Sequence, residues 1–134
     1  MFGDNNPTTM IAVKDLNRAR RFYEGILGLK PVGEANEEVQ AYQSGDTRLA
    51  VYRSQFAGTN KATLLTWTVD DVETVVADLK SRGVGFEHYD MPDTTLQGDV
   101  HVMGSMKNAW FKDPDGNILA VMNRIEVPAG ARTT

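Results

Sequence analysis

The stretch WFKDPDGN at residues 110–117 decides how this chain is organised. Its centre, DPDG at 113–116, has the chemistry of a tight turn, because the proline fixes φ at the second position and the glycine accepts the conformation that ends a turn. The flanking segments, 107–112 and 117–123, combine apolar, aromatic and β-branched residues in the manner of strands. The stretch therefore predicts a two-stranded hairpin near the end of the chain.

The residues before this hairpin predict a strand, a helix and a second strand. TLLTWTV at 63–69 is rich in β-branched and apolar residues, and Asp70 or Asp71 is placed to cap a helix. Apolar residues recur at helical spacing through 72–79, and Gly83 closes the helix. The expected remainder is a strand at 84–89 and a long loop at 91–105.

The first half of the chain repeats this pattern. A strand at 8–13 leads into a helix that Asp15 caps and Gly28 closes. Strands are expected at 30–32, 38–43 and 47–53. The landmarks Val13, Asp15 and Leu16 match Val69, Asp71 and Val72, which lie 56 positions later.

The repeat predicts two βαβββ modules, at 8–53 and 63–123, within a single domain of 134 residues. Residues 54–62 form the boundary, and 1–7 and 128–134 are expected to be frayed ends. One helix covers only one face of each sheet, so the two modules can curve their sheets around a shared space. The expected fold class is α+β, with curved mixed sheets around a concave cleft of the kind that binds small ligands.

Composition narrows the function. The chain has 14 Lys and Arg against 18 Asp and Glu, a net charge of −4, which argues against nucleic acid as the main partner. It has no cysteine, so disulfides, thiolate metal sites and cysteine nucleophiles are excluded. No apolar run approaches the roughly 18 residues that span a bilayer, and the first residues lack the pattern of a secretory signal. We expect a cytoplasmic protein with no membrane partner.

Several motifs resemble one superfamily. They are VKDL at 13–16, RFY at 21–23, LGL at 27–29 and, most specifically, WFKDPDGN at 110–117. In this respect the chain is similar to the vicinal oxygen chelate superfamily, which includes glyoxalase I, extradiol dioxygenases and the bleomycin-resistance proteins. The resemblance extends over residues 8–123. It implies the paired βαβββ fold but leaves the activity open, because this fold hosts unrelated functions.

The resemblance also implies four positions at which the enzymes of the superfamily hold a divalent metal with His, Glu or Gln. This chain has Thr8, Ala50, Leu64 and Ala120 at those positions. Three of these side chains cannot bind a metal, and one hydroxyl is too few ligands for a hard cation. We therefore expect no metal or other cofactor. His88 and His101, with carboxylates nearby in 90–105, are the remaining candidates for an unusual metal site.

Strand alternation turns these four positions into a set of side chains that face the cleft. The candidate ligand-binding residues are Trp110, Tyr52, Met10, Arg48, Thr66, Thr68 and Met122, with Tyr42 and His101 as further candidates. Phe111 and Trp67 are expected to lie on the helix side of the sheets. Flat aromatic rings and adaptable methionines suit a large, planar, mostly apolar ligand.

Two functions follow from this lining. The first is a metal-free binding protein without catalytic residues, similar to the bleomycin-resistance branch, that confers antibiotic self-resistance by sequestering an aromatic natural product such as an enediyne or a bleomycin-like drug. The second is a metal-independent lyase, isomerase or cyclase of natural-product metabolism, which would need a general acid or base. Candidates for that role are His101, His88, Asp93 and Tyr52. A third interpretation is a glyoxalase- or dioxygenase-like metalloenzyme whose metal-binding residues lie at other positions.

A homodimer is expected for each of these functions, and the identity of the bound small molecule stays open.

Overall fold

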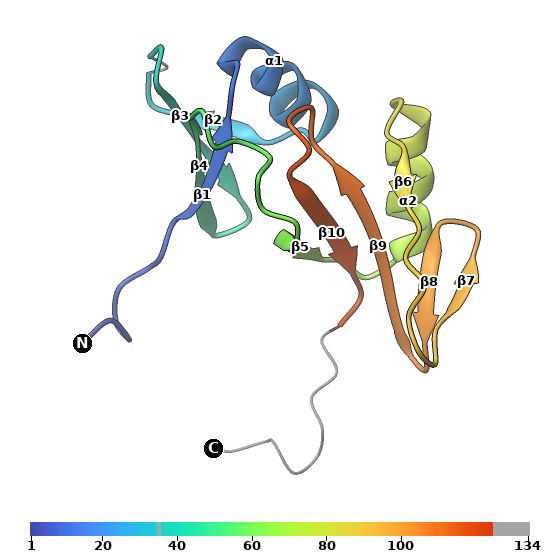
Figure 1. The fold of residues 1–134 in the computed structure, drawn as a ribbon. Helices are drawn as coiled ribbons and strands as arrows, with labels where there is room; N and C mark the ends of the chain where they lie inside the picture. The colour runs from blue at the N-terminus through green and yellow to red at the C-terminus, as the bar shows by residue number, and fades with distance from the viewer. Residues whose placement is uncertain (35, 125–134) are drawn as a thin grey trace. The chain divides into compact units, whose positions relative to one another are not determined.

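The computed structural model describes residues 1–34 and 36–124, so the tail predicted at 128–134 lies outside the described residues. The first sheet has the order β1-β4-β3-β2, with β1 parallel to β4 and the other pairs antiparallel. Its elements are β1 (Thr9–Val13), α1 (Leu16–Arg20), η1 (Arg21–Ile26), β2 (Lys30–Val32), β3 (Val39–Ser44) and β4 (Thr47–Arg53) (Figure 1). This is the strand order that the first βαβββ module requires.

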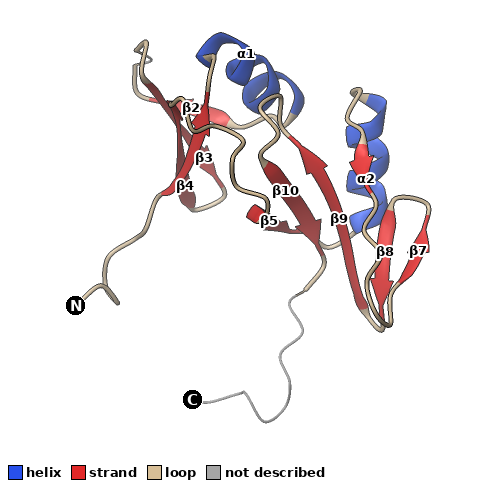
Figure 2. Cartoon of the chain, viewed as in Figure 1, coloured by secondary structure: helices blue, strands red, loops and turns tan. Residues whose placement is uncertain are grey.

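The second sheet has the order β5-β10-β9-β8-β7, and β6 pairs with β9. Its elements are β5 (Thr63–Thr68), α2 (Val72–Ser81), β6 (Phe86–Glu87), β7 (Thr95–Gln97), β8 (Val100–Met103), β9 (Met106–Lys112) and β10 (Ile118–Met122). The β7–β8 hairpin lies inside the segment 91–105, so the prediction of a long loop there was wrong (Figure 2). The two sheets confirm the predicted α+β class with modules of βαβββ type.

Both helices begin at the predicted aspartates. The Asp15 carboxylate accepts hydrogen bonds from the backbone N–H groups of Asn17 and Arg18, and Asp71 accepts one from Thr74. The first helix then widens into the π-helical segment η1, where the backbone N–H of Leu27 reaches back five residues to Phe22. This widening was not predicted, because a π-segment of about one turn disturbs the apolar spacing of an α-helix over only a few residues.

The chain divides into two compact units. The N-terminal unit comprises Met1–Leu65 with Lys112–Ile118, and the C-terminal unit comprises Thr66–Phe111 with the described residues from Leu119 onward. The turn between β9 and β10 therefore belongs to the N-terminal unit, although its two strands belong mostly to the other.

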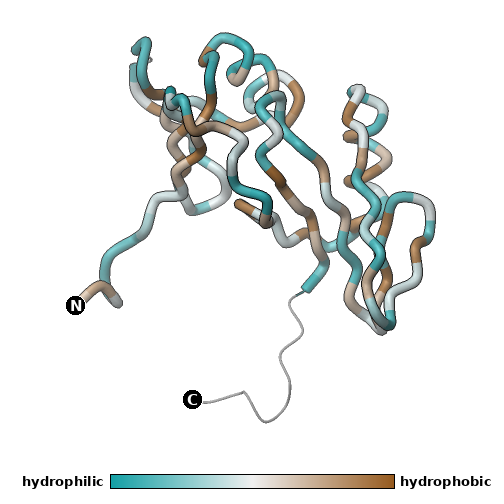
Figure 3. Tube along the Cα trace, in the orientation of Figure 1, coloured by the Kyte–Doolittle hydropathy of each residue, from teal (hydrophilic) through white to brown (hydrophobic). Residues whose placement is uncertain are grey.

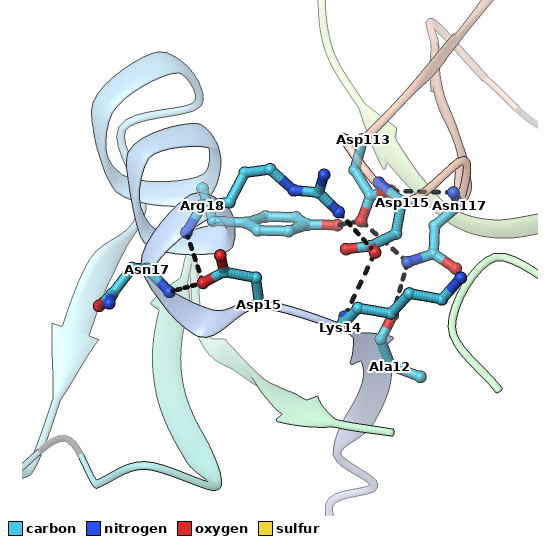
Figure 4. A network of polar contacts seen from close by, with 9 residues as sticks. Ala12, Lys14, Asp15, Asn17, Arg18, Asp113, Asp115 and Asn117 are labelled. Atoms are coloured by element: carbon cyan, nitrogen blue, oxygen red, sulfur yellow. Dashed lines mark hydrogen bonds and ion pairs between the residues drawn. The ribbon is translucent and has the colours of Figure 1, made fainter. Parts of the chain in front are cut away.

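A network of buried polar contacts holds that turn in the N-terminal unit (Figure 4). The Tyr23 hydroxyl donates to Asp113 Oδ2 over 2.7 Å, and the Asn117 amide donates to the same oxygen and to the backbone oxygen of Ala12, each over 2.8 Å. Arg18 Nη2 lies 2.8 Å from Asp115 Oδ1. The acidic residues of WFKDPDGN thus have a structural role.

Strand alternation buries most of the apolar residues as predicted, although Trp67 of β5, which was expected on the helix side, is only half-buried. Ile11, Val13, Leu49 and Val51 are buried in the N-terminal unit, and Phe111, Leu119 and Val121 are buried in the C-terminal unit. Figure 3 shows the resulting hydrophobic stretch along β10. Within the described residues, no helix has both the length and the apolar character that crossing a membrane requires.

Candidate ligand-binding site

Trp110 and Phe111 are neighbours on β9 that point to opposite faces of the second sheet. Phe111 is fully buried and lies opposite Phe86 of β6, with the ring centres 5.7 Å apart. Trp110 is half-buried on the other face. The predicted orientation of these two rings therefore agrees with the structure.

Strand pairing shows which side chains share that face with Trp110. Asn108 alternates with Trp110 along β9, His101 lies directly opposite Asn108, and Leu96 lies directly opposite His101. Met103 alternates with His101 along β8, and the ring of Tyr89 contacts both Trp110 and His101. Glu87 of β6 lies directly opposite Trp110 and shares the face as well. We call the other six residues, Tyr89, Leu96, His101, Met103, Asn108 and Trp110, the Trp110 face.

Three aromatic rings form the centre of this face. The ring centres of His101 and Trp110 are 4.8 Å apart and those of Tyr89 and Trp110 are 5.3 Å apart, in both cases edge to face. Tyr89 and His101 are stacked with centres 6.2 Å apart. Such contacts hold the rings in fixed orientations, so that the cluster presents a preformed aromatic surface.

The rim of the cluster is apolar and exposed. Tyr89, Leu96 and Met103 are 37%, 44% and 36% exposed, which is unusual for side chains of this size on one sheet face. A cavity of about 260 Å³ lies at this edge. Its lining consists of His88, Tyr89, Asp90, Met91, Thr94, Leu96 and His101. This is room for part of a small aromatic molecule.

His101 is 2% exposed and has one hydrogen bond. Its Nε2 atom accepts from the backbone N–H of Tyr89 over 2.9 Å. A backbone N–H can only donate, so the ring proton of the neutral imidazole is on Nδ1. Nδ1 is buried and has no hydrogen-bond partner in the described part of the chain.

His88 lies at the exposed edge of the cavity and is hydrogen-bonded to Asp99, which also forms an ion pair with Lys80. Its Nε2 lies 2.7 Å from Asp99 Oδ1, and Lys80 Nζ lies 2.7 Å from Asp99 Oδ2. Hydrogen bonds from Lys80 and, secondarily, His88 hold the pKa of the Asp99 carboxyl below its usual range. These contacts join the segments around Lys80, His88 and Asp99 at the mouth of the cavity.

The N-terminal unit carries three of the predicted ligand residues on one face of its own sheet. Met10 lies beside Ala50 and Tyr52 beside Ala12, and Arg48 alternates with Ala50 along β4. Met10 is 50% exposed, Arg48 is exposed and Tyr52 is half-buried. These side chains are available for contact.

Tyr42 lies on the opposite face of that sheet. It pairs with Leu49, is 1% exposed, and donates its hydroxyl proton to Glu24 Oε2 over 2.7 Å. Burial, with the Glu24 hydrogen bond as a second cause, raises the pKa of Tyr42. The structure thus places Tyr42 in the core, apart from Met10 and Tyr52.

The other predicted residues lie on β5 and β10. Thr66 is half-buried and Thr68 is exposed. Met122 is half-buried, and the hydrogen bond from the Asn123 backbone N–H to the Lys107 oxygen places it next to Asn108 across the β9–β10 pair. Met122 thereby extends the Trp110 face toward the middle of the sheet.

The side chains at the four expected metal-ligand positions do not fit a divalent metal. At the four positions where relatives would supply ligands, Ala50, Leu64 and Ala120 offer no lone pair, and Thr8 is exposed before β1. Among residues 1–34 and 36–124, no three His, Asp or Glu side chains gather in a group that could hold an ion.

A larger cavity, of about 710 Å³, lies in the N-terminal unit. Its lining is Lys14, Asp15, Leu16, Asn17, Arg20, Asn36, Glu37 and Arg53. These side chains mix both signs of charge and include no aromatic ring. The cavity therefore lacks the features that make the Trp110 face suitable for a planar ligand.

Sequence reasoning missed Tyr89, Leu96, Met103 and Asn108. Asn108 could have been found, because it has the same parity as Trp110 along one strand. Leu96 and Met103 could not, since they lie on the β7–β8 hairpin that was predicted to be a loop, and Tyr89 is placed by its contact with His101 of that hairpin.

Comparison with known proteins gives a consistent answer for the fold. The model of the Glyoxalase/Bleomycin resistance protein/Dioxygenase superfamily matches residues 7–121. A glyoxalase family protein from Enterococcus faecalis has a similar structure, with a TM-score of 0.70 and 21% identity over 91% of this chain and 99% of that one.

Two further solved structures have the same fold. TnmS3, an antibiotic binding protein from Streptomyces sp. CB03234, matches with a TM-score of 0.60 and 19% identity over 88% of this chain and 95% of its own. The fosfomycin resistance protein FosX from Mesorhizobium loti matches with a TM-score of 0.65 and 14% identity, over 91% and 93%. At these identities the likeness concerns the fold alone.

Proposed function

This chain belongs to the Glyoxalase/Bleomycin resistance protein/Dioxygenase superfamily, and from that premise we propose that it is a metal-free protein that binds a planar aromatic small molecule. The observation that carries the proposal is the preformed cluster of Trp110, His101 and Tyr89 beside an exposed apolar rim. Rigid aromatic anchors of this kind supply much of the affinity at binding sites.

Sequestration of an antibiotic is the biological role we propose for this binding. TnmS3, which shares the fold, is an antibiotic binding protein. The Trp110 face combines aromatic rings with two methionines, Met103 and Met122 at its end, and Glu87 of β6, directly opposite Trp110, adds one carboxylate to the same face of the sheet. Such a surface suits a flat polycyclic compound better than a strongly anionic one.

The bonding of His101 supports binding rather than turnover. The lone pair on Nε2 is already used by the backbone N–H of Tyr89, and Nδ1 carries the proton. His101 is therefore arranged as a hydrogen-bond donor and not as a general base. We propose no catalytic residue.

A metal-independent enzyme is the second candidate, and one observation favours it. His88 and Asp99 form a 2.7 Å pair at the edge of the cavity, which is the geometry of an oriented general base. Lys80 shares the same carboxylate, which fits a structural network equally well. Turnover separates the two functions, because a binding protein returns its ligand unchanged.

The experiment that tests the proposed function is native mass spectrometry of the purified protein and of Trp110→Ala. We expect wild-type protein to carry a small organic molecule with an aromatic absorption spectrum, and Trp110→Ala to lose it. Trp67→Phe is the matched control and should retain it. A molecule retained equally by Trp110→Ala would place the site elsewhere.

We also propose a homodimer, for which light scattering should give about twice the chain mass of 14.8 kDa.

A further inference from the structure

The first sheet has an open face on the side away from its helix. Tyr42 and Leu49 are buried on the helix side, where the Tyr42 hydroxyl reaches Glu24. On the other side Arg48 is exposed and Tyr52 is half-buried. An uncovered face of an antiparallel sheet is usually polar, but the central side chains of this face are apolar, namely Met10, Val32, Val39, Ala41, Ala50 and Tyr52. Such a surface favours an occupant that covers it.

Strand pairing arranges the apolar side chains of this open face in rows. Ala50 lies directly opposite Met10 of β1 on one side and Ala41 of β3 on the other. Ala41 in turn lies opposite Val32 of β2. We call these four residues the alanine row. Its two middle members carry only a methyl group, so this part of the sheet presents a flat apolar surface that suits a planar ring.

The neighbouring row carries two cations. Gln43 of β3 lies directly opposite Lys30 of β2 and Arg48 of β4, two positions along the strands from the alanine row, which is a step of about 7 Å. The ion pairs of residues 1–34 and 36–124 involve neither Lys30 nor Arg48. Asp46, the carboxylate nearest to Arg48 in the sequence, lies in the exposed hairpin turn and pairs with neither cation. The apolar surface therefore ends at two positive charges.

Gln43 orients one of these cations. Its Nε2 donates to the backbone oxygen of Gly45 over 2.7 Å, and its Oε1 lies 3.4 Å from Arg48 Nε. This arrangement leaves the two terminal amino groups of the Arg48 guanidinium for another acceptor. Lys30 and Arg48 lie two strands apart, about 10 Å between Cα atoms, so their long side chains can reach one group placed between them.

From this juxtaposition we infer that the open face of the first sheet is a second binding site, which takes a flat aromatic acid. The ring would lie on the alanine row, and the carboxylate would accept hydrogen bonds from Lys30 and Arg48. The inference concerns a different sheet from the Trp110 face and does not rest on the function proposed for that face.

Charge and shape together decide between the classes of ligand. A carboxylate between Lys30 and Arg48 would offset the repulsion of two like charges and form charge-assisted hydrogen bonds. A neutral ring would cover the alanine row but leave both cations as they are, and a cationic ring would be repelled. A small inorganic anion would pair with the cations and cover no apolar surface. An aromatic acid uses both rows.

Calorimetry with 2-naphthoate and 2-naphthamide tests the inference, because the two compounds share a ring system and differ in charge at pH 7. We expect wild-type protein to bind 2-naphthoate at least about fivefold more tightly than 2-naphthamide at low salt. This preference should shrink at an ionic strength of about 1 M. In the double variant Lys30→Gln with Arg48→Gln, the two affinities should become equal.

The matched control is the double variant Lys61→Gln with Arg21→Gln, which removes the same charges from two exposed positions off this face. It should keep the preference for 2-naphthoate, and so should Trp110→Ala. Phenanthridin-6(5H)-one, a flat neutral compound, is the probe of the Trp110 face. Its affinity should be unchanged in the variant that lacks Lys30 and Arg48, so the two sites can fail separately.

Each contrary result has a distinct meaning. Equal affinities of wild-type protein for 2-naphthoate and 2-naphthamide would overturn the inference and leave the proposed function standing. A preference that disappears in Trp110→Ala would place the acid on the Trp110 face and would also overturn it. Met10→Asp tests whether a second copy of the chain covers the open face instead. A change from dimer to single chain in that variant, measured by light scattering, would make the face an interface between copies and reject the second site.

Discussion

The edge of the His101 ring meets the Trp110 ring with their centres 4.8 Å apart, and this contact fixes Trp110 from the β8 side while Phe111 is anchored on the opposite face. The Trp110 side chain is half-buried, and its orientation is set by its neighbours on the sheet. A side chain held in this way loses little freedom when a ligand binds, which favours a large contribution to affinity.

Replacing Trp110 should weaken binding much more than it weakens the fold. We expect Trp110→Ala to lose about 2–4 kcal/mol of binding free energy for phenanthridin-6(5H)-one, in the range of central aromatic anchors. Calorimetry measures this loss, and thermal unfolding measures stability. Phe56→Ala is the control and should bind as tightly as wild type, since Phe56 is exposed and lies outside the candidate site. Unchanged affinity in Trp110→Ala would mean that the Trp110 face is not the site.

The Tyr23 hydroxyl should be important for stability alone. Tyr23→Phe removes the donor to Asp113 Oδ2 in a fully buried setting, which should cost about 1–3 kcal/mol of unfolding free energy. Tyr52→Phe is the control, because Tyr52 is half-buried on an accessible sheet face. Chemical denaturation of both variants provides the comparison. Equal, small losses in the two would show that the network of Figure 4 contributes little.

Asp99 should make the protein sensitive to acid. Hydrogen bonds from Lys80 and then His88 lower the pKa of Asp99 in the folded chain. These hydrogen bonds therefore stabilise the folded chain fully at pH values above the pKa of Asp99 in the unfolded chain, which is about 3.9. Their contribution to the free energy of unfolding is lost as the pH falls through the lower pKa of Asp99 in the folded chain. Asp99→Asn should unfold more easily than wild type at pH 7, and the difference should shrink toward pH 3. Asp46→Asn, in an exposed turn, should show no such trend.

Metal should have no effect on this protein. Ala50, Leu64 and Ala120 occupy positions that need donor atoms, and the described residues hold no alternative group of three. We expect elemental analysis to find no stoichiometric zinc, nickel, iron or manganese, and a chelator to change neither the unfolding temperature nor ligand affinity. About one metal ion per chain, removed by chelation with loss of binding, would contradict this expectation.

The sequence predicted most of the fold because the deciding signals are local. The DPDG turn, the caps at Asp15 and Asp71, and the alternation that buries Phe111 and exposes Trp110 each depend on a few adjacent residues. The π-helical widening at 21–26 and the β7–β8 hairpin were not predicted. β7 is three exposed residues between Pro92 and Gly98, and it carries too little pattern to be recognised as a strand.

The site was only partly predictable for a different reason. Trp110 could be named from alternation and His101 from the chemistry of its imidazole, but their contact depends on how the β8–β9 hairpin folds. Tyr42 shows the same limit, because only its pairing with Leu49 reveals that it lies on the helix side. That His101 Nδ1 lacks a partner among the described residues is visible only once the surrounding side chains are placed.

The most direct test of the account is a nuclear magnetic resonance titration of ¹⁵N-labelled protein with phenanthridin-6(5H)-one. The chain has 2 tryptophans, so its spectrum has one indole N–H signal for Trp67 and one for Trp110, which Trp67→Phe assigns. If a planar ligand lies against the Trp110 face, the Trp110 signal shifts and saturates with added ligand while the Trp67 signal stays in place. A shift confined to Trp67, or no shift at saturating ligand, would contradict the account.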